Sequence, residues 1–276
     1  MSEQALQNGQ EGFLLNEFLL LLAFAAFGLL LIMEVVKPYQ PINKRIRQAS
    51  VVTNSTAFIF NNIILTALRA SSLFFVAQQF TQFGLLNGME SGPVKWLLTF
   101  LLFDLMMYGW HAATHKYELL WRFHKIHHSD KTVNVTTGFR FHVFDLFIEI
   151  LIKCLFVIVV GVEAYLVLAI ELIEMLFIFF HHSNVAFKHE AEISKVFITP
   201  DLHRAHHSAL RSEHDSNYGI VLSIWDRIFG TRKDLIPKKL GLDVIEAENF
   251  LQLFFLAFVT ERHIKKLMQI LPKGKP

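Results

Sequence analysis

Three histidine clusters with helical spacing constrain this chain more than any other feature of its sequence. The first cluster is an HxxxH pair, and the other two are HxxHH triplets; the eight residues are His111 and His115, then His124, His127 and His128, then His203, His206 and His207. Residues three or four apart lie on one face of a helix, so each cluster presents its imidazoles on one side. Neutral imidazole is the commonest metal ligand in proteins. The spacing predicts that three separate segments converge on metal.

The number of histidines indicates more than one ion. A zinc-like ion takes about four ligands, whereas the three clusters supply eight side chains. Imidazole suits iron, zinc, copper and nickel, so the residue type alone does not select the metal. A lone histidine is usually a satisfied core or surface residue, and that reading stays open for any single one of the eight. For the whole set we expect a pair of metal ions.

The apolar content indicates a membrane protein. Hydrophobic residues make up 53% of the 276 residues, with 28 Phe, whereas soluble domains are nearer roughly 45–50% apolar. The excess falls in long runs, as is typical of membrane spans. The net charge of +2 gives no sign of a nucleic-acid partner. The single cysteine, Cys154, excludes an internal disulfide and a thiolate cluster.

The apolar runs predict four or five membrane-spanning helices of about 20 residues each. We place the first three at residues 13–36, 57–80 and 94–110; the second is the weakest because it contains Asn61, Asn62 and Arg69. The run 144–180 is long enough for two spans with a break near Gly161. The alternative is a helical hairpin that enters the bilayer only partly.

Charge asymmetry predicts that all three clusters lie on one side of the membrane. The loop after the first run carries four basic residues, and the loop after the second carries none before Lys95. The positive-inside rule therefore makes residues 37–56 cytoplasmic. Counting forward places the first two clusters on the cytoplasmic side, and two crossings within 144–180 return the chain there before the third cluster. A single crossing would separate the clusters.

Several motifs between residues 95 and 232 resemble those of the fatty acid hydroxylase/sterol desaturase superfamily of integral-membrane di-iron enzymes. That family carries HxxxH, HxxHH and a late HxxHH in this order, and the resemblance covers about residues 95–232. A histidine before a short polar pair, an Arg-x-His element and two tail motifs also match; they are His182-Ser183-Asn184, Arg140-Phe141-His142, Asn217-Tyr218-Gly219 and residues 225–231. One departure is visible after His142, where members often have Pro and, two residues later, Glu. Val143 and Asp145 stand there, which weakens His142 as a ligand.

The resemblance implies two iron ions, with zinc as a substitute, molecular oxygen as cosubstrate and a membrane lipid as substrate. It adds His182 to the ligands, so the expected set is His111, His115, His124, His127, His128, His182, His203, His206 and His207. A separate electron-transfer protein, cytochrome b5-like or ferredoxin-like, would supply electrons. His181, His189, His214 and His263 match no ligand position. Asp104, Asp226 and Asn184 are candidates to orient imidazoles, with a plain structural hydrogen bond as the alternative.

The expected fold is all-α, a multi-span transmembrane helix bundle with a cytosolic helical cap that carries the dimetal site. We divide the chain into N-terminal transmembrane helices and loops (1–93), a fatty acid hydroxylase-like catalytic region (94–232) and a C-terminal amphipathic helical tail (233–276). The tail suits a helix in the membrane interface or one packed on the cap. The membrane would be the inner or plasma membrane in a bacterium, or the endoplasmic reticulum in a eukaryote.

Three functions are consistent with these residues. The first is a hydroxylase or related lipid oxygenase, and the second is a desaturase on the same metal centre. The third is a non-oxidative zinc protein of the membrane, such as a protease or a carrier. A zinc protease typically carries HExxH, but residues 111–115 contain no Glu. A carrier would hold its ligands near the bilayer midplane, whereas these clusters follow the apolar runs.

Overall fold

All regular structure in the described part of the chain is helical. The computed structural model describes residues 3–68, 73–242 and 249–259. Within these residues it contains twelve α-helices and two short 3-10 helices, and β-structure is limited to isolated bridges at Phe197–Leu222 and Ser208–Leu240. The all-α prediction is therefore confirmed.

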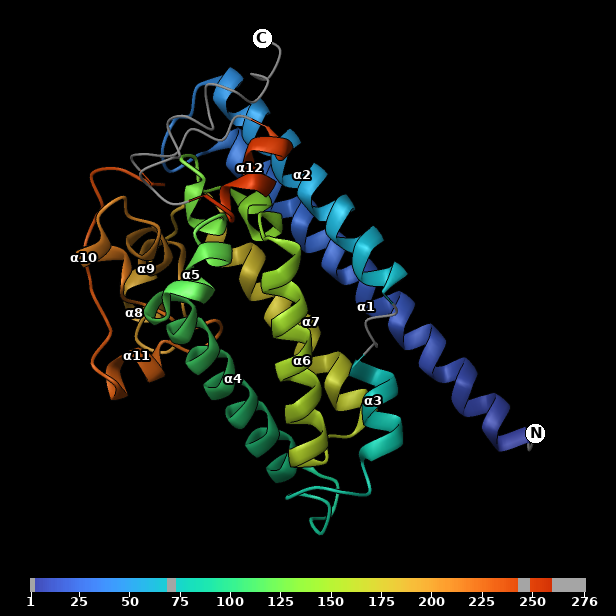
Figure 1. Cartoon of the computed structure of the whole chain (residues 1–276). Helices are drawn as coiled ribbons and strands as arrows, with labels where there is room; N and C mark the ends of the chain where they lie inside the picture. Colours follow the sequence, from blue (N-terminus) through green and yellow to red (C-terminus); the bar gives the residue numbers. More distant parts are fainter. Residues whose placement is uncertain (1–2, 69–72, 243–248, 260–276) are drawn as a thin grey trace.

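Five long helices form the body of the molecule, and short helices gather at one end of it (Figure 1). The long helices are α1 (Glu3–Val36), α2 (Lys44–Ala67), α4 (Pro93–Lys116), α6 (Val143–Val160) and α7 (Ala164–His182). The short ones that we call the cap are α5 (Glu118–His124), η1 (His127–Ser129), η2 (Val135–Phe139), α8 (Glu190–Ile193), α9 (Pro200–His206), α10 (Arg211–His214) and α11 (Ile224–Ile228). Two more are α3 (Leu73–Phe80) and α12 (Phe250–Leu256). The chain enters the cap from the ends of α4 and α7.

The predicted break near Gly161 is the turn of a hairpin between α6 and α7. Gly161 ends α6 in the left-handed conformation, with φ of 77°, which glycine adopts without a Cβ penalty. The loop before α4 closes onto this turn: Leu85 and Leu86 donate to the Val159 and Val160 carbonyls, each at 2.9 Å. A Cβ atom on Gly84 would lie 2.3 Å from the Gly161 nitrogen. Glycine is therefore required where these two backbones cross.

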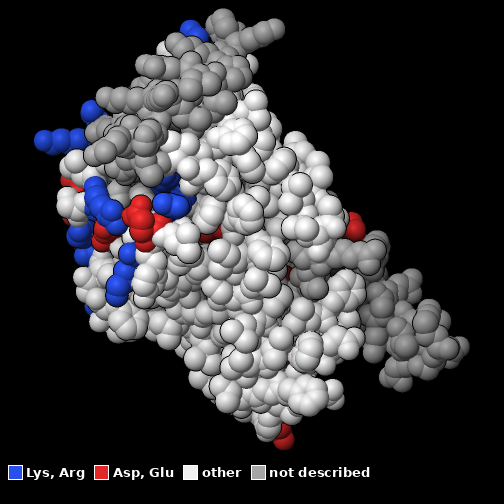
Figure 2. Space-filling view, viewed as in Figure 1, with Lys and Arg blue, Asp and Glu red and all other residues white. Residues whose placement is uncertain are grey.

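Two helices are long and apolar enough to cross a membrane by length and composition. They are residues Glu17–Val36 of α1 and Ala164–His182 of α7. The α1 segment is largely exposed on the protein, with Leu21, Phe24 and Ile32 at 67%, 71% and 60% exposure. Figure 2 shows charged side chains gathered near the cap end, while most of that face over the long helices carries none.

The region 57–80 differs from the single helix expected for it. The helix that enters it, α2, already begins at Lys44 and ends at Ala67, and the eight-residue α3 is separate. Eight residues rise only about 12 Å, too little to cross a bilayer alone. The first part of α2 buries polar residues, among them Ser50 and Asn54, because this part of the helix packs against η2 of the cap. Arg69 lies outside the described residues, as do the charged positions 261–266 of the tail.

A buried ionic cluster ties α6 to α7. The Lys153 Nζ atom of α6 lies 2.8 Å from a Glu149 oxygen and 2.5 Å from a Glu174 oxygen of α7. The Lys153 and Glu174 side chains are only 10% and 6% exposed. A buried charge is tolerated when it is paired in this way. The pairing fixes which faces of the hairpin helices meet, and the hairpin returns the chain to the cap.

Candidate metal centre

Nine buried histidines come together where the cap meets the long helices. His111 and His115 lie in the last two turns of α4, His124 ends α5, and His127 and His128 form η1. The others are His182 at the end of α7 and His203, His206 and His207 on and just after α9. Each is at most 5% exposed. The set is the one expected from the sequence and the family resemblance.

The nine imidazoles form two groups. The first histidine group is His111, His115, His124, His128 and His206, and the second histidine group is His127, His182, His203 and His207. Within each group, one ring nitrogen per residue lies within 4.8 Å of every other. The groups adjoin, because the His128 and His207 rings stack with their centroids 4.6 Å apart.

Each HxxHH motif contributes to both groups. In the earlier motif, the outer residues His124 and His128 belong to the first group and the middle residue His127 belongs to the second. In the later motif the assignment is reversed, since His203 and His207 belong to the second group and His206 to the first. The two groups are therefore interleaved, and neither is built from one motif alone.

In the first group, acceptors hold the outward-facing nitrogens. The Nδ1 atoms of His111 and His206 lie 2.8 and 2.6 Å from the Tyr218 and Ser216 carbonyl oxygens. Carbonyls only accept, so these Nδ1 atoms carry the proton and leave Nε2 as a lone pair. The buried His206 Nε2 atom has no hydrogen-bond partner.

Two carboxylates do the same for His124 and His115, whereas neither ring nitrogen of His128 has a hydrogen-bond partner. The Asp145 carboxylate lies 3.0 Å from His124 Nδ1, and the Asp215 carboxylate lies 3.2 Å from His115 Nδ1. The Nε2 atoms of His124 and His115 are buried without a partner. Metal-bound histidines are typically oriented in this way, by an acceptor on the second ring nitrogen. The first group therefore fits a metal ion.

In the second group, four Nε2 atoms face one another. The Nε2 distances are 3.0 Å from His127 to His182, 2.9 Å from His182 to His203 and 3.1 Å from His203 to His207. His182 donates from Nδ1 to the Ile178 carbonyl at 2.7 Å, so its Nε2 atom is a lone pair. A cation among these nitrogens satisfies them all, and the second group also fits a metal ion.

Burial keeps these rings neutral. Loss of solvation is the main cause, and neighbouring imidazoles add to it; together they lower the pKa well below the usual histidine range at His127, His128, His203, His206 and His207. A metal ligand must be unprotonated. The cluster is therefore ready to bind metal at neutral pH without losing protons first.

Comparison with known proteins agrees with this geometry. The family model for fatty acid hydroxylases matches residues 96–231. Residues 96–231, about half of the chain, thus form a fatty acid hydroxylase domain of the fatty acid hydroxylase/sterol desaturase superfamily. The matched segment contains all nine histidines of the two groups and the hairpin that brings them together. No solved structure matches the chain.

Among curated proteins, the chain is similar to two kinds of lipid enzyme. Ornithine lipid hydroxylase OlsE of Rhizobium tropici is 31% identical over 145 residues, which cover 50% of this chain and 44% of the relative. Alkylglycerol monooxygenase of Homo sapiens is 30% identical over 171 residues, covering 59% and 38%. The Xenopus tropicalis alkylglycerol monooxygenase is 26% identical over 214 residues, covering 77% and 46%. The matched segments thus span less than half the length of these relatives.

Asp145 stands where members of the family often have Glu. It keeps a carboxylate in contact with the cluster, because it lies 3.0 Å from His124 Nδ1.

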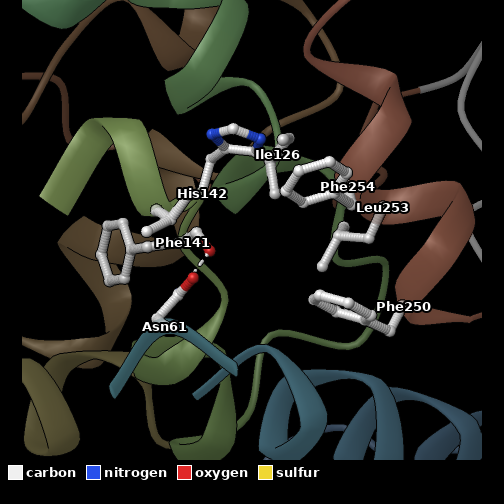
Figure 3. Close-up of a pocket in the computed structure, with 8 residues that line it drawn as sticks. Asn61, Ile126, Phe141, His142, Phe250, Leu253 and Phe254 are labelled. Atoms are coloured by element: carbon white, nitrogen blue, oxygen red, sulfur yellow. Dashed lines mark hydrogen bonds between the residues drawn. The ribbon is translucent and has the colours of Figure 1, made fainter. Parts of the chain in front are cut away.

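His142, two residues after Arg140, belongs to neither group. Its Nδ1 atom accepts the Phe144 N–H at 3.2 Å and caps α6. Its ring lines a small pocket together with Phe250, Leu253 and Phe254 of α12 (Figure 3), and the Phe254 ring lies 5.0 Å from it. His142 is therefore structural.

The three polar residues that were candidates to orient imidazoles make structural hydrogen bonds instead. Asp104 accepts from the Val221 and Leu222 N–H groups and from Trp225 Nε1. Asp226 accepts from the Tyr218 and Gly219 N–H groups at 2.8 and 2.9 Å, and Asn184 bonds to the Gln40 backbone. Asp104 and Asp226 thereby shape the loop whose Tyr218 carbonyl holds His111.

Asp215, the backbone carbonyls and the role of Asp145 beside His124 are the parts of the site that sequence reasoning missed. Asp215 lies in no recognisable motif. Every residue has a backbone carbonyl, so the sequence does not identify the ones that accept from a histidine. Among the remaining histidines, the His181 ring lies 4.0 Å from that of His203 without joining a group. His189 is exposed, and His263 lies outside the described residues.

The metal-free protein should lose stability in acid. The folded-state pKa values of the five histidines above are lowered, so below about pH 6.5 the unfolded chain binds more protons than the folded one. Stability then falls as pH decreases, by at most about 1.4 kcal/mol per histidine per pH unit. We expect a lower Tm at pH 5.5 than at pH 7.5 for chelator-treated protein in detergent. The exposed His189→Gln variant should behave like the parent, and a Tm independent of pH would contradict the assignment.

The Asp145→Asn variant should bind metal more weakly. An asparagine keeps the size of the side chain but removes the negative charge opposite His124 Nδ1, and losing such a partner typically costs roughly 10- to 100-fold in metal affinity or activity. Asp145→Glu should retain much more, because it keeps a carboxylate. Metal content after graded chelation measures the difference. Equal retention by all three proteins would show that Asp145 does not support the site.

Proposed function

We propose that the protein is a membrane-bound di-iron oxidoreductase that uses O₂ to hydroxylate, or otherwise oxidise, a C–H bond of a lipid such as a fatty acyl chain or a sterol-like lipid. The observation that carries this proposal is the pair of adjoining groups of buried, neutral imidazoles. The similarity to a lipid hydroxylase and to monooxygenases supports the reaction class and favours hydroxylation over desaturation on the same centre.

The chemistry requires a cofactor, since no side chain can oxidise an unactivated C–H bond. Two bound iron ions would supply this chemistry by activating O₂, and a separate donor protein would supply the electrons. His111, His115, His124, His128 and His206 would hold one ion, and His127, His182, His203 and His207 the other. The protein's own contribution is to orient these rings through Asp145, Asp215 and three carbonyls, and to exclude water from them. Their exposure of at most 5% supports that role.

We further propose that the chain crosses the membrane five times, through α1, α2 with α3, α4, α6 and α7. The metal groups would lie just beyond the cytoplasmic surface, because the end of α4, the start of α6 and the end of α7 all meet at the cap (Figure 1). The basic residues between 37 and 47 support this orientation. The exposed apolar side chains of α1 suit contact with lipid.

Zinc is the competing metal, because imidazole groups bind it as well. Metal analysis of the purified protein separates the two readings. About two iron ions per chain, with lipid-dependent oxygen uptake, are expected for the oxygenase. A protein that binds zinc and consumes no oxygen even after reconstitution with ferrous ion and a reductant would overturn the proposal.

His127→Ala should abolish turnover without unfolding the protein. It removes one of four rings from the second group and leaves the five rings of the first group intact. The metal content should fall from about two to about one ion per chain, while the variant stays inserted in the membrane. His189→Ala is the matched control, since that ring is exposed. Full activity of His127→Ala would exclude His127 from the site.

The substrate class is tested by comparing membrane lipids. A strain that lacks the protein should lose at least one oxygenated lipid species and accumulate its precursor, which differs by one oxygen atom. Expression of the parent protein should restore the pattern, whereas His127→Ala should not. An unchanged lipid profile under conditions where the protein is expressed would count against a membrane lipid as substrate.

A further inference from the structure

A third set of metal-ligating atoms lies beside the first histidine group. One ligand atom each of His115, His214 and Asp215 lies within 4.8 Å of the other two. The Asp215 Oδ1 atom is 3.2 Å from His115 Nδ1 and 3.8 Å from His214 Nε2. The His214 side chain is 3% exposed, whereas that of Asp215 is 37% exposed. The set is thus buried on the histidine side and open to solvent through Asp215.

The hydrogen bonds of His214 leave its inner nitrogen as a lone pair. His214 Nδ1 lies 2.9 Å from the Ser208 carbonyl oxygen, which can only accept, so Nδ1 carries the proton. The buried Nε2 atom has no hydrogen-bond partner. The Trp121 ring stacks on this imidazole at 5.2 Å between centroids and holds its orientation. A lone pair of His214 therefore faces a carboxylate oxygen across a gap that no donor fills.

We propose that His214 Nε2 and Asp215 Oδ1 bind a zinc-class divalent cation, separate from the two histidine groups, and that this cation inhibits the enzyme by competing with the His115 Nδ1 proton for Asp215 Oδ1. Both atom types are zinc ligands at about 2.0–2.2 Å, so atoms 3.8 Å apart reach one ion with an angle of about 130° between them. Water fills the remaining positions on the solvent side. The borderline softness of zinc suits a nitrogen and oxygen pair.

Inhibition follows from the position of Asp215. The same Oδ1 atom that would bind the cation accepts the His115 Nδ1 proton, and His115 is a member of the first histidine group. Loss of that acceptor weakens a histidine ligand. This inhibitory step rests on the proposed oxygenase function, whereas binding of the cation does not.

Arg211 sets the affinity of the site. Its Nε atom lies 3.2 Å from Asp215 Oδ2, and its side chain is 60% exposed. The guanidinium charge repels a cation at Asp215, although an exposed pair of this kind is weak, at about 0.2–1 kcal/mol. Removing that charge should therefore tighten the site, whereas removing His214 should abolish it. The Arg211 and His214 substitutions should therefore change the Zn²⁺ affinity in opposite directions.

The test measures Zn²⁺ binding to the full-length protein in detergent, after its dimetal centre has been loaded and its iron content recorded. The parent and the exposed-histidine control His189→Gln should bind one more Zn²⁺ per chain than His214→Gln. Arg211→Gln should bind this ion up to roughly fivefold more tightly at low ionic strength. Equal zinc stoichiometry in the parent and His214→Gln overturns the proposal. If His214→Gln loses the metal loaded into its dimetal centre, the Arg211→Gln variant decides the question. A Zn²⁺ affinity of Arg211→Gln equal to that of the parent then overturns the proposal.

Turnover at the same zinc concentrations separates this proposal from the proposed function. The parent should lose activity as the additional Zn²⁺ binds, with its iron retained, and His214→Gln should resist. If no protein oxidises lipid while the additional zinc ion still binds in a His214-dependent way, the oxygenase proposal fails and the site stands. If both proteins oxidise lipid but zinc inhibits the parent and His214→Gln equally, the proposed zinc site is wrong and the oxygenase proposal stands.

Discussion

The structure of the cap depends on the shared need of nine buried imidazoles for a partner. An unpaired buried polar group costs about 1–3 kcal/mol, and most of these rings have a nitrogen that finds no donor or acceptor in the protein. A cation in the first group would remove this cost at four Nε2 atoms at once, those of His115, His124, His128 and His206. A cation in the second group would be a shared partner for the four Nε2 atoms that face one another there. Because the rings come from α4, α5, η1, α7 and α9, the same two ions would join segments that the backbone leaves separate. Metal binding and folding of the cap are therefore coupled.

The interleaving of the two groups makes this coupling stronger. His127 and His128 are neighbours in η1 yet face different groups, as do His206 and His207. A shift of either segment toward one ion would move a ligand of the other. Two separate motifs, each holding its own ion, would lack that constraint. The arrangement thus favours a centre in which the two proposed ions would share a single rigid geometry.

The sequence predicted which residues meet but not how they are divided. Local spacing identified the three clusters, and the membrane count required the hairpin that turns at Gly161. The division was not predictable from spacing: in each HxxHH motif the residues four apart share a group, as on a helix, whereas the middle histidine, three residues after the first, belongs to the other group. The orienting carbonyls of Tyr218 and Ser216 depend on tertiary folding, since every residue has a carbonyl.

The N-terminal helices also support the cap through polar side chains. Glu34 near the end of α1 accepts the Val135 and Asn184 N–H groups at 2.7 and 2.6 Å. Asn54 of α2 accepts from Arg140 at 2.9 Å. Arg140 also donates to the Ile126 carbonyl, just before η1, and to Ser129, the last residue of η1. A boundary at residue 93 therefore separates the histidines from side chains that fix their backbone. Polar positions in otherwise apolar helices are costly, and here they are retained where the cap needs support.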